Sequence, residues 1–314
     1  MTEPPRTRLA TLPTPLVPAH RLSRLLGVQV WLKRDDLTGL GLGGNKARQL
    51  EFIIGHAESV GANALVTGGG PRSNWVMLAA LAAVNRGMSA EVALFGDPRP
   101  AQGNLELLQR IPGVCVQFTG DPDRASVDPM LQRISARLEG EGRKPHIVGR
   151  GGAGPHGALG YVWAVDEMNV QMEALGLEAP TIWVPTGSCG TQAGLVAGHR
   201  LPVGPTRRVV GVSVHRPVDE CRLRIEDFAA GALELLGQRP LRDTVWEVLG
   251  DRLTPRRREA DAAAAMVAAT EGVFLDPEFG APAMAELISR APRIDGPVVF
   301  VVTGGAPNLF VGNP

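Results

Sequence analysis

The chain has 314 residues, which is longer than one typical domain and predicts two domains in one body. Apolar residues make up 44% and charged residues 20%, as in soluble globular proteins. Lysine plus arginine and aspartate plus glutamate each number 32, so the net charge is zero. This balance excludes an electrostatic argument for nucleic acid or an anionic membrane as a partner, and no apolar run is long enough to span a bilayer.

The cysteines and the N-terminus restrict the setting further. Cys115, Cys189 and Cys221 are odd in number, widely spaced and outside any CxxC or CxxH pattern. This arrangement argues against a zinc site or a disulfide framework and favours a reducing compartment. The N-terminus leads into no apolar signal segment. We therefore expect a cytoplasmic protein without a bound metal.

The first fifty residues predict an extended entry, one strand and a Gly-rich turn. Prolines make residues 12–16 extended, and the alternation over 28–34 is typical of a short strand. Gly43, Gly44 and Asn45 form a turn directly before Lys46, and a helical run extends to residue 59. A lysine in this position is either a solvated surface residue or a Schiff-base lysine, whose amine must lose a proton before it attacks a carbonyl. The positive end of the helix dipole would lower its pKa.

Strands and helices then alternate over the rest of the chain. We expect strands over 64–67, 89–95, 114–118, 146–148, 181–185, 209–214 and 297–302, with a short strand and turn over 272–277. We expect helices over 74–85, 104–110, 130–139, 158–175, 260–271 and 283–290, with a mostly helical stretch over 217–248. This alternation predicts an α/β fold with doubly wound, mostly parallel sheets.

Gly-rich turns recur at the carboxyl ends of the predicted strands, the edge at which open α/β sheets bind ligands. The strongest of them extends from Thr186 to Gly194. A strand, a Gly/Ser/Thr loop and a helix together present backbone N–H groups to a phosphate. The stretch matches neither the P-loop nor GxGxxG, and it can also be a plain tight turn. Together with a turn-borne lysine, a phosphate cradle favours pyridoxal phosphate, which needs both.

Six motifs in register carry a family resemblance over residues 12–310. They are Pro13-Thr14-Pro15-Leu16, Lys33-Arg34-Asp35-Asp36, Gly43-Gly44-Asn45-Lys46, Ser73-Asn74, Gly187-Ser188-x-Gly190-Thr191 and Thr303-Gly304-Gly305-Ala306-Pro307. The series resembles the fold-type II pyridoxal-phosphate enzymes, which share the fold of the tryptophan synthase β subunit. Within them it is most similar to the D-cysteine desulfhydrase and 1-aminocyclopropane-1-carboxylate (ACC) deaminase group.

The resemblance implies a role for each matching residue. Lys46 would form the Schiff base with the cofactor, and Ser73 would meet the substrate carboxylate or help to move a proton. Asn74 would bind the ring hydroxyl, and Thr303 would face the pyridine nitrogen. The phosphate would lie on the loop formed by Thr186, Gly187, Ser188, Cys189, Gly190 and Thr191. The resemblance also implies a small domain of residues 51–159, a large domain of residues 1–50 and 160–314, and a homodimer.

Two departures from the family pattern concern the substrate. The carboxylate loop reads Arg72-Ser73-Asn74-Trp75, where the family has Gln-Ser-Asn followed by His or Gln. Arg72 either contacts a substrate acid or faces solvent, and Trp75 either shrinks the pocket or packs in the core. Phe279 stands where ACC deaminases have a tyrosine, and Arg252 or its neighbours stand where they have a second one. Phe279 has no hydroxyl for acid–base chemistry.

These features predict a lyase that performs α,β-elimination on a small or β-substituted amino acid. Trp75 and Phe279 favour a bulkier or more apolar β-substituent than that of D-cysteine, whereas cyclopropane opening by the family's route is not expected. Two alternatives stay open at this point: an amino-acid racemase or isomerase, with Ser73 as the second acid–base group, and a homologue that binds the cofactor without lyase activity. Cys189 fits a small residue at a helix start better than a nucleophile.

Overall fold

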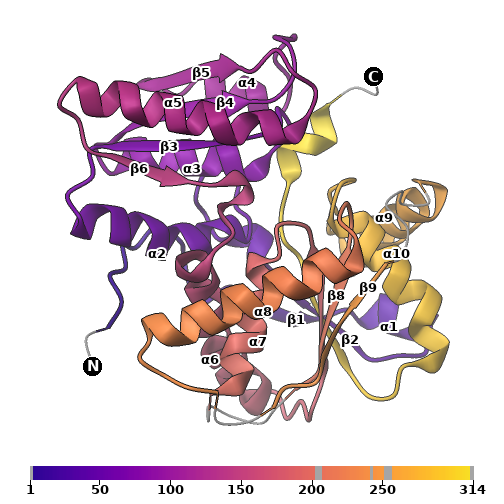
Figure 1. Cartoon of the computed structure of the whole chain (residues 1–314). Coiled ribbons are helices and arrows are strands. Elements are labelled where there is room, and N and C mark those ends of the chain that lie inside the picture. The colour runs from indigo at the N-terminus through magenta and orange to yellow at the C-terminus, as the bar shows by residue number, and fades with distance from the viewer. Residues whose placement is uncertain (1–2, 202–206, 241–242, 251–256, 312–314) are drawn as a thin grey trace.

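The structure is a computed structural model, and it describes residues 3–201, 207–240, 243–250 and 257–311. Two sheets form two layers of the molecule, one above the other in Figure 1. The four-stranded sheet is parallel throughout, in the order β5-β4-β3-β6. Its strands are β3 (Ala64–Gly69), β4 (Ser89–Leu94), β5 (Val114–Phe118) and β6 (Pro145–Val148), and its helices are α3 (Asn74–Asn85), α4 (Asn104–Gln109) and α5 (Val127–Gly140).

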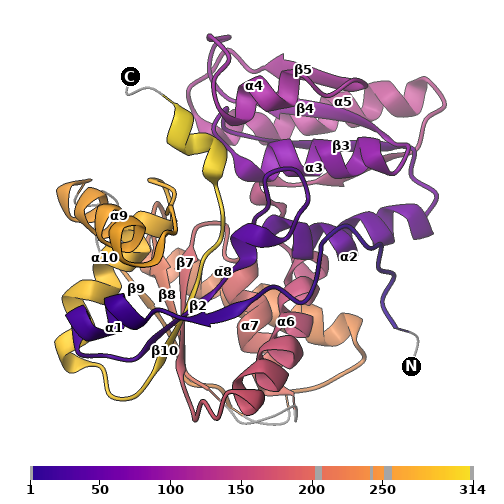
Figure 2. The same ribbon diagram turned by 180° about the vertical axis from the view of Figure 1, so that it is seen from behind.

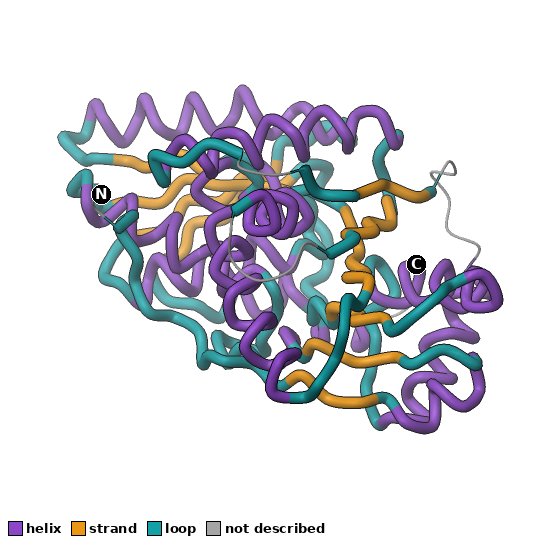
Figure 3. The backbone as a smooth tube through the Cα atoms, turned by 90° about the horizontal axis from the view of Figure 1, so that it is seen from below, coloured by secondary structure: helices purple, strands orange, loops and turns teal. Residues whose placement is uncertain are grey.

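The six-stranded sheet has the order β1-β2-β10-β7-β8-β9, and only the β1–β2 pair is antiparallel. Its strands are β1 (Leu16–Pro18), β2 (Val30–Lys33), β7 (Thr181–Thr186), β8 (Val209–Ser213), β9 (Trp246–Leu249) and β10 (Val298–Val301). One face packs on α6 (Pro155–Ala174), α7 (Gly190–Arg200) and α8 (Val218–Leu235), and the other on α1 (His20–Leu26), α9 (Arg257–Glu271) and α10 (Gly280–Arg290), as Figure 2 shows. Seen from below, helices lie on both sides of the strands (Figure 3).

Helix α2 (Lys46–Ser59) lies between the two layers and packs on both α3 and α6 (Figure 1). Its residues Leu50, Ile53 and Ile54 belong to the apolar core of the four-stranded sheet. Phe52 belongs to the core between the six-stranded sheet and helices α6, α7 and α8. The expected domain boundaries at 50/51 and 159/160 fall inside α2 and α6, and the division into domains stays a prediction.

A buried polar network fixes the N-terminal end of α2. Arg48 donates to both carboxylate oxygens of Asp35 at 2.9 Å and to Glu167 at 2.7 and 2.8 Å. Tyr161 donates to Asp35, and Thr14 donates to it at 2.7 Å. Arg48 and Asp35 are almost inaccessible to solvent. The network therefore joins the N-terminal segment, α2 and α6 directly beside Lys46.

Most expected elements are present, and the exceptions have physical causes. Residues 246–249, expected in a helical stretch, form β9, because they pair along the exposed edge of β8. Of the short strand and turn expected over 272–277, the strand is absent, because residues 273–276 pair with no strand among the described residues. The turn lies at residues 277–279, where Asp276 accepts the N–H groups of Glu278, Phe279 and Gly280 at 2.8–3.0 Å. β1 and α1 were not expected. In the described part of the chain no helix has the length and apolarity that a membrane span requires.

Candidate active site

One cavity of about 340 Å³ opens where the carboxyl ends of strands from both sheets meet. This volume lies in the range of roughly 300–1,000 Å³ that is typical of cofactor and small-molecule sites. The walls come from the start of α2, the β3–α3 and β7–α7 loops, the segments after β4, β5, β6, β8 and β10, and the turn before α10. Every sequence-predicted site residue except Gly190 lines it: Lys46, Arg72, Ser73, Asn74, Trp75, Thr186, Gly187, Ser188, Cys189, Thr191, Phe279 and Thr303.

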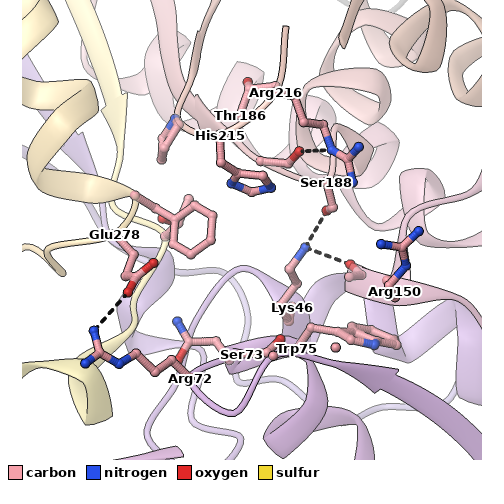
Figure 4. A pocket seen from close by; sticks show the side chains of 18 of the residues that line it. Lys46, Arg72, Ser73, Trp75, Arg150, Thr186, Ser188, His215, Arg216 and Glu278 are labelled. Carbon is pink, nitrogen blue, oxygen red and sulfur yellow. Dashed lines mark hydrogen bonds and ion pairs between the residues drawn. The ribbon is translucent and has the colours of Figure 1, made fainter. Parts of the chain in front are cut away.

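Lys46 is the first residue of α2, and its amine points into the cavity (Figure 4). The Nζ atom donates to Ser188 Oγ, to the Gly151 carbonyl and to Gln49 Oε1, each at 3.1 Å. No carboxylate of the described residues forms an ion pair with it. Burial lowers the pKa of the amine from 10.5 to about 8. The amine is therefore neutral far more often than that of a solvated surface lysine.

The β7–α7 loop faces this amine and is held against α2. Thr191 Oγ1 accepts hydrogen bonds from Asn45 Nδ2 at 2.8 Å and from Gln49 Nε2 at 3.1 Å. A Cβ on Gly187 would lie 2.6 Å from the Phe279 ring, so only glycine fits there. The first N–H groups of α7 have no acceptor in a preceding turn, which makes this end an anion site. Gly190, the first residue of α7, lies behind the loop and does not line the cavity.

Cys189 precedes α7 with a φ of 76°, in the left-handed region that favours glycine. Its side chain is buried, and its thiol forms no disulfide. A hydrogen bond with Cys221 and burial both raise the pKa of its thiol well above the ordinary value. A thiol held in the protonated form is a poor nucleophile, which agrees with the interpretation of Cys189 as a small residue at a helix start.

The β3–α3 loop supplies the opposite wall. Ser73 caps α3 by accepting the Val76 N–H, and Asn74 Oδ1 accepts from Asn104 at 2.6 Å. Trp75 packs in the apolar core with 2% of its surface exposed, donates its indole N–H to Thr67 at 2.9 Å and still reaches the cavity wall. Arg72 is 46% exposed at the rim, 3.5 Å from Glu278. Trp75 therefore packs in the core and Arg72 faces solvent at the rim, while a contact between Arg72 and a substrate acid stays a prediction.

Phe279 and Thr303 complete the cavity on the side of the six-stranded sheet. The Phe279 ring meets His215 edge to face, with ring centres 5.9 Å apart. The Thr303 carbonyl accepts the Asn45 N–H at 3.0 Å, which places the end of β10 beside the turn before Lys46. Arg252 lies outside the described residues.

Several cavity residues were not predicted from the sequence. Among them is His215, a titratable side chain in the cavity wall. It follows β8, and its ring lies against Gly187. Burial lowers the pKa of His215 to about 4, with Arg124 and Arg216 adding to the effect, so the ring is neutral at pH 7. Arg216 donates to the Gly187 carbonyl at 3.0 Å. Their only sequence signal is their place after the carboxyl end of a strand.

A model of the pyridoxal-phosphate dependent enzyme family matches residues 7–304. The chain belongs to this family. D-Cysteine desulfhydrase of Yersinia enterocolitica is 36% identical over 99% of this chain and 96% of the relative. D-Cysteine desulfhydrase of Klebsiella pneumoniae is 34% identical over 100% and 98%. The crystal structure of an ACC deaminase homologue superimposes with a TM-score of 0.88, at 34% identity over 98% of this chain and 93% of the other.

These comparisons confirm the predicted fold class and the predicted cofactor, pyridoxal 5′-phosphate. The roles of the individual site residues stay predictions. Their position around one cavity is the geometry on which those predictions depend.

Proposed function

We propose that this pyridoxal-phosphate dependent enzyme is a lyase of the D-cysteine desulfhydrase type, which eliminates the β-substituent of a small or β-substituted amino acid. The observation that carries the proposal is the Lys46 amine, which lies inside the cavity 3.1 Å from Ser188 with a pKa near 8. An amine that is neutral in a substantial fraction at physiological pH can hold a carbonyl cofactor and accept a proton.

The residues around the cavity fit pyridoxal phosphate. Lys46 would hold the aldehyde carbon, and the N–H groups at the start of α7 would bind the phosphate. Asn74 would bind the ring hydroxyl, and Thr303 would face the ring nitrogen. When bound, the cofactor supplies an electron sink that makes the α-proton of the amino acid acidic.

Separate side chains of the cavity would transfer the proton, bind the substrate carboxylate and exclude water. Lys46 would take the α-proton, and Ser73 would bind the α-carboxylate or relay a proton, with Arg72 at the rim as a second carboxylate contact. Trp75 excludes water from one wall. Phe279 offers no proton to a poor leaving group, so the site favours elimination of a group that leaves as a stable anion.

The altered pocket is part of the proposal. Trp75 and Phe279 each present a flat apolar surface to the cavity, which favours a bulkier or more apolar β-substituent than the thiol of D-cysteine. A Trp75→His variant is expected to turn over free D-cysteine faster than the native protein does. Equal rates of keto-acid release would contradict this part of the proposal.

The decisive experiment measures the visible absorption of the purified protein with and without pyridoxal phosphate, then with D- and L-amino acids including cysteine, β-chloroalanine and ACC. We expect a cofactor band that is lost in Lys46→Ala and kept in the exposed control Lys144→Ala, together with keto-acid release from one panel member. Inversion at the α-carbon without keto acid would indicate a racemase. A cofactor band with no reaction would indicate a binding protein.

We further propose that the enzyme is a cytoplasmic homodimer. The free state of all three cysteines supports a reducing compartment, and the family resemblance supports the dimer. Sedimentation equilibrium should give twice the chain mass of 33.2 kDa. A mass of one chain at micromolar concentration would contradict the dimer.

A further inference from the structure

The cavity wall is rich in arginine. Its lining includes one carboxylate, that of Glu278, against the cations of Lys46, Arg72, Arg99, Arg124, Arg150 and Arg216. The arginines come from five separate segments, so the sequence gives no sign that they gather. Figure 4 shows Arg150 and Arg216 on the side of Ser188, and Arg72 with Glu278 across the cavity from them.

Three of these arginines already have carboxylate partners. Arg150 makes a two-point contact with Asp128 at 2.7 and 3.0 Å. Arg216 pairs with Glu220, and Arg72 lies 3.5 Å from Glu278. Pairing largely cancels the field of these side chains at the cavity centre.

Arg99 and Arg124 are different. Among the described residues no carboxylate forms an ion pair with either. Arg99 follows β4 and donates to the Asp97 carbonyl at 3.5 Å. Arg124 follows β5, and its guanidinium lies 5.9 Å from the centre of the Phe95 ring, which also lines the cavity. Both side chains are solvent-exposed, so they are free to turn toward a ligand.

The two arginines are separate from the groups assigned to the cofactor. The proposed phosphate loop belongs to the six-stranded sheet, whereas Arg99 and Arg124 follow strands of the four-stranded sheet. The charge of Arg124 nevertheless reaches across the cavity, because it contributes to the lowered pKa of His215. The α-carboxylate is assigned to Ser73 and Arg72, on a third segment. No anion has yet been assigned to this pair.

We propose that Arg99 and Arg124 form a subsite for a second anionic group, a carboxylate, sulfonate or phosphate, carried on the β-substituent of the substrate. This inference rests on the proposed lyase function. Guanidinium groups bind such planar or tetrahedral anions with paired hydrogen bonds. Trp75 and Phe279 taken alone favour an apolar substituent. An apolar group beside Arg99 and Arg124 would leave both guanidinium groups without a hydrogen-bond acceptor, whereas an anionic group would pair with them.

The reaction needs no further reagent. A base removes the α-proton, a double bond forms between Cα and Cβ, and the bond from Cβ to the substituent breaks. Its electron pair leaves on the sulfur or oxygen atom that was bonded to Cβ, so the substituent departs as sulfite, phosphate or a thiolate that carries the carboxylate. Aspartate, whose carboxylate is bonded directly to Cβ, cannot undergo this step and serves only as a binding probe. Hydrolysis of the product with one water molecule gives pyruvate and ammonium. The overall reaction is redox-neutral, so it requires neither an oxidant nor a reductant.

Binding is tested first, with a pair of ligands that differ in charge and hardly in shape. Isothermal titration of the holoenzyme compares aspartate with asparagine, in both enantiomers and at low salt. We expect one aspartate enantiomer to bind at least about tenfold more tightly than its amide, since a hydrogen bond to a charged group is worth that much or more. Arg124→Gln and Arg99→Gln should remove most of this preference. The control Arg110→Gln changes an exposed arginine outside the cavity and should keep it.

Turnover is tested second, by comparing keto-acid release from O-phosphoserine and from serine. We expect Arg124→Gln to lower the ratio of their kcat/KM values about tenfold and to leave the cofactor dissociation constant unchanged. Equal binding of aspartate and asparagine would overturn the subsite and leave the lyase proposal standing. Preferential aspartate binding without any turnover would keep the subsite and overturn the lyase. Weaker cofactor binding in Arg124→Gln with an unchanged aspartate preference would show that the arginine serves the cofactor phosphate, which overturns the inference.

Discussion

At the scale of single residues, the pKa of the Lys46 amine is set by its position in the folded chain and not by its neighbours in the sequence. Its amine has no carboxylate partner among the described residues and three neutral acceptors at 3.1 Å. A lysine beside a carboxylate keeps its proton, whereas a buried lysine with neutral neighbours loses it more readily. Burial is thus the main cause of its lowered pKa, and the helix dipole that the sequence suggested is not needed to explain it.

The lowered pKa of Lys46 makes cofactor loading depend on pH. Only the neutral amine attacks a carbonyl, so the loading rate falls as pH drops below the amine's pKa of about 8. We expect the rate at which the visible band appears in apoprotein to rise about tenfold from pH 6 to pH 7 and to level off above pH 8. A rate that still climbs steeply from pH 9 to pH 10 would mean that the amine is solvated.

Cys189 allows a test of backbone strain in the β7–α7 loop. Its φ of 76° disfavours any residue with a Cβ and disfavours β-branched residues most. We expect Cys189→Gly to keep both stability and cofactor loading. The free energy of unfolding of Cys189→Val should be lower than that of the glycine variant by on the order of 2 kcal/mol. Urea denaturation of the two variants measures the difference. Equal unfolding free energies would contradict the strain argument.

At the scale of elements, α2 is the part of the fold on which the site depends. It begins at Lys46, lies between the two layers and is tied by Arg48 to Asp35 and Glu167. Burial alone would raise the pKa of Asp35, but the Arg48 guanidinium outweighs it and holds that pKa below its ordinary value. The pair is therefore ionised at neutral pH, and removal of Arg48 leaves the buried Asp35 carboxylate without its ion-pair partner.

Removal of this guanidinium should be strongly destabilising. We expect Arg48→Met to lower the unfolding free energy by about 3–5 kcal/mol and to impair cofactor loading, because the start of α2 loses its anchor. The control Arg110→Met removes a 73% exposed arginine and should change stability by no more than about 0.5 kcal/mol. Urea denaturation of both variants gives the comparison. A loss from Arg48→Met no larger than that from the control would refute the role of the network.

At the scale of the whole molecule, the cavity takes walls from both sheets, and the C-terminal segment crosses from one to the other. After β10 the chain forms a short helical turn over Ala306–Phe310, where Asn308 accepts a hydrogen bond from Asn104 at 3.2 Å. In Figure 1 this segment runs from the lower layer up to the four-stranded sheet. A ligand in the cavity contacts both layers and stabilises them together.

Cofactor binding should therefore raise the stability of the molecule as one unit. With free pyridoxal phosphate at a hundredfold excess over its dissociation constant, we expect a gain of about 2.7 kcal/mol and one cooperative thermal transition at a higher temperature. Lys46→Ala should lose much of this gain, whereas Lys144→Ala should keep it. Scanning calorimetry with and without cofactor is the measurement. Two transitions, of which the cofactor shifts only one, would show that the site belongs to a single layer.

The division between sequence and tertiary structure follows from the range of the interactions involved. The alternation of strands and helices, the Gly-rich turns and the turn-borne lysine are local patterns, so the α/β fold class and the cofactor followed from the sequence alone. The same patterns predicted twelve of the residues that line the cavity. β9 did not, because an edge strand is decided by the neighbour that it pairs with. The lowered pKa of Lys46 and the neutral state of His215 depend on burial, which is a property of the packed chain.

The arginine-lined cavity wall is the clearest case of what only the tertiary structure decided. Arg99 and Arg124 lie in loops that carry no motif, and exposed arginines are common on any surface. They matter because the parallel sheet brings the carboxyl ends of β4 and β5 to the same edge as the cofactor site. Residue type is encoded locally, but convergence of charge on one cavity arises only when segments distant in the chain are folded against one another.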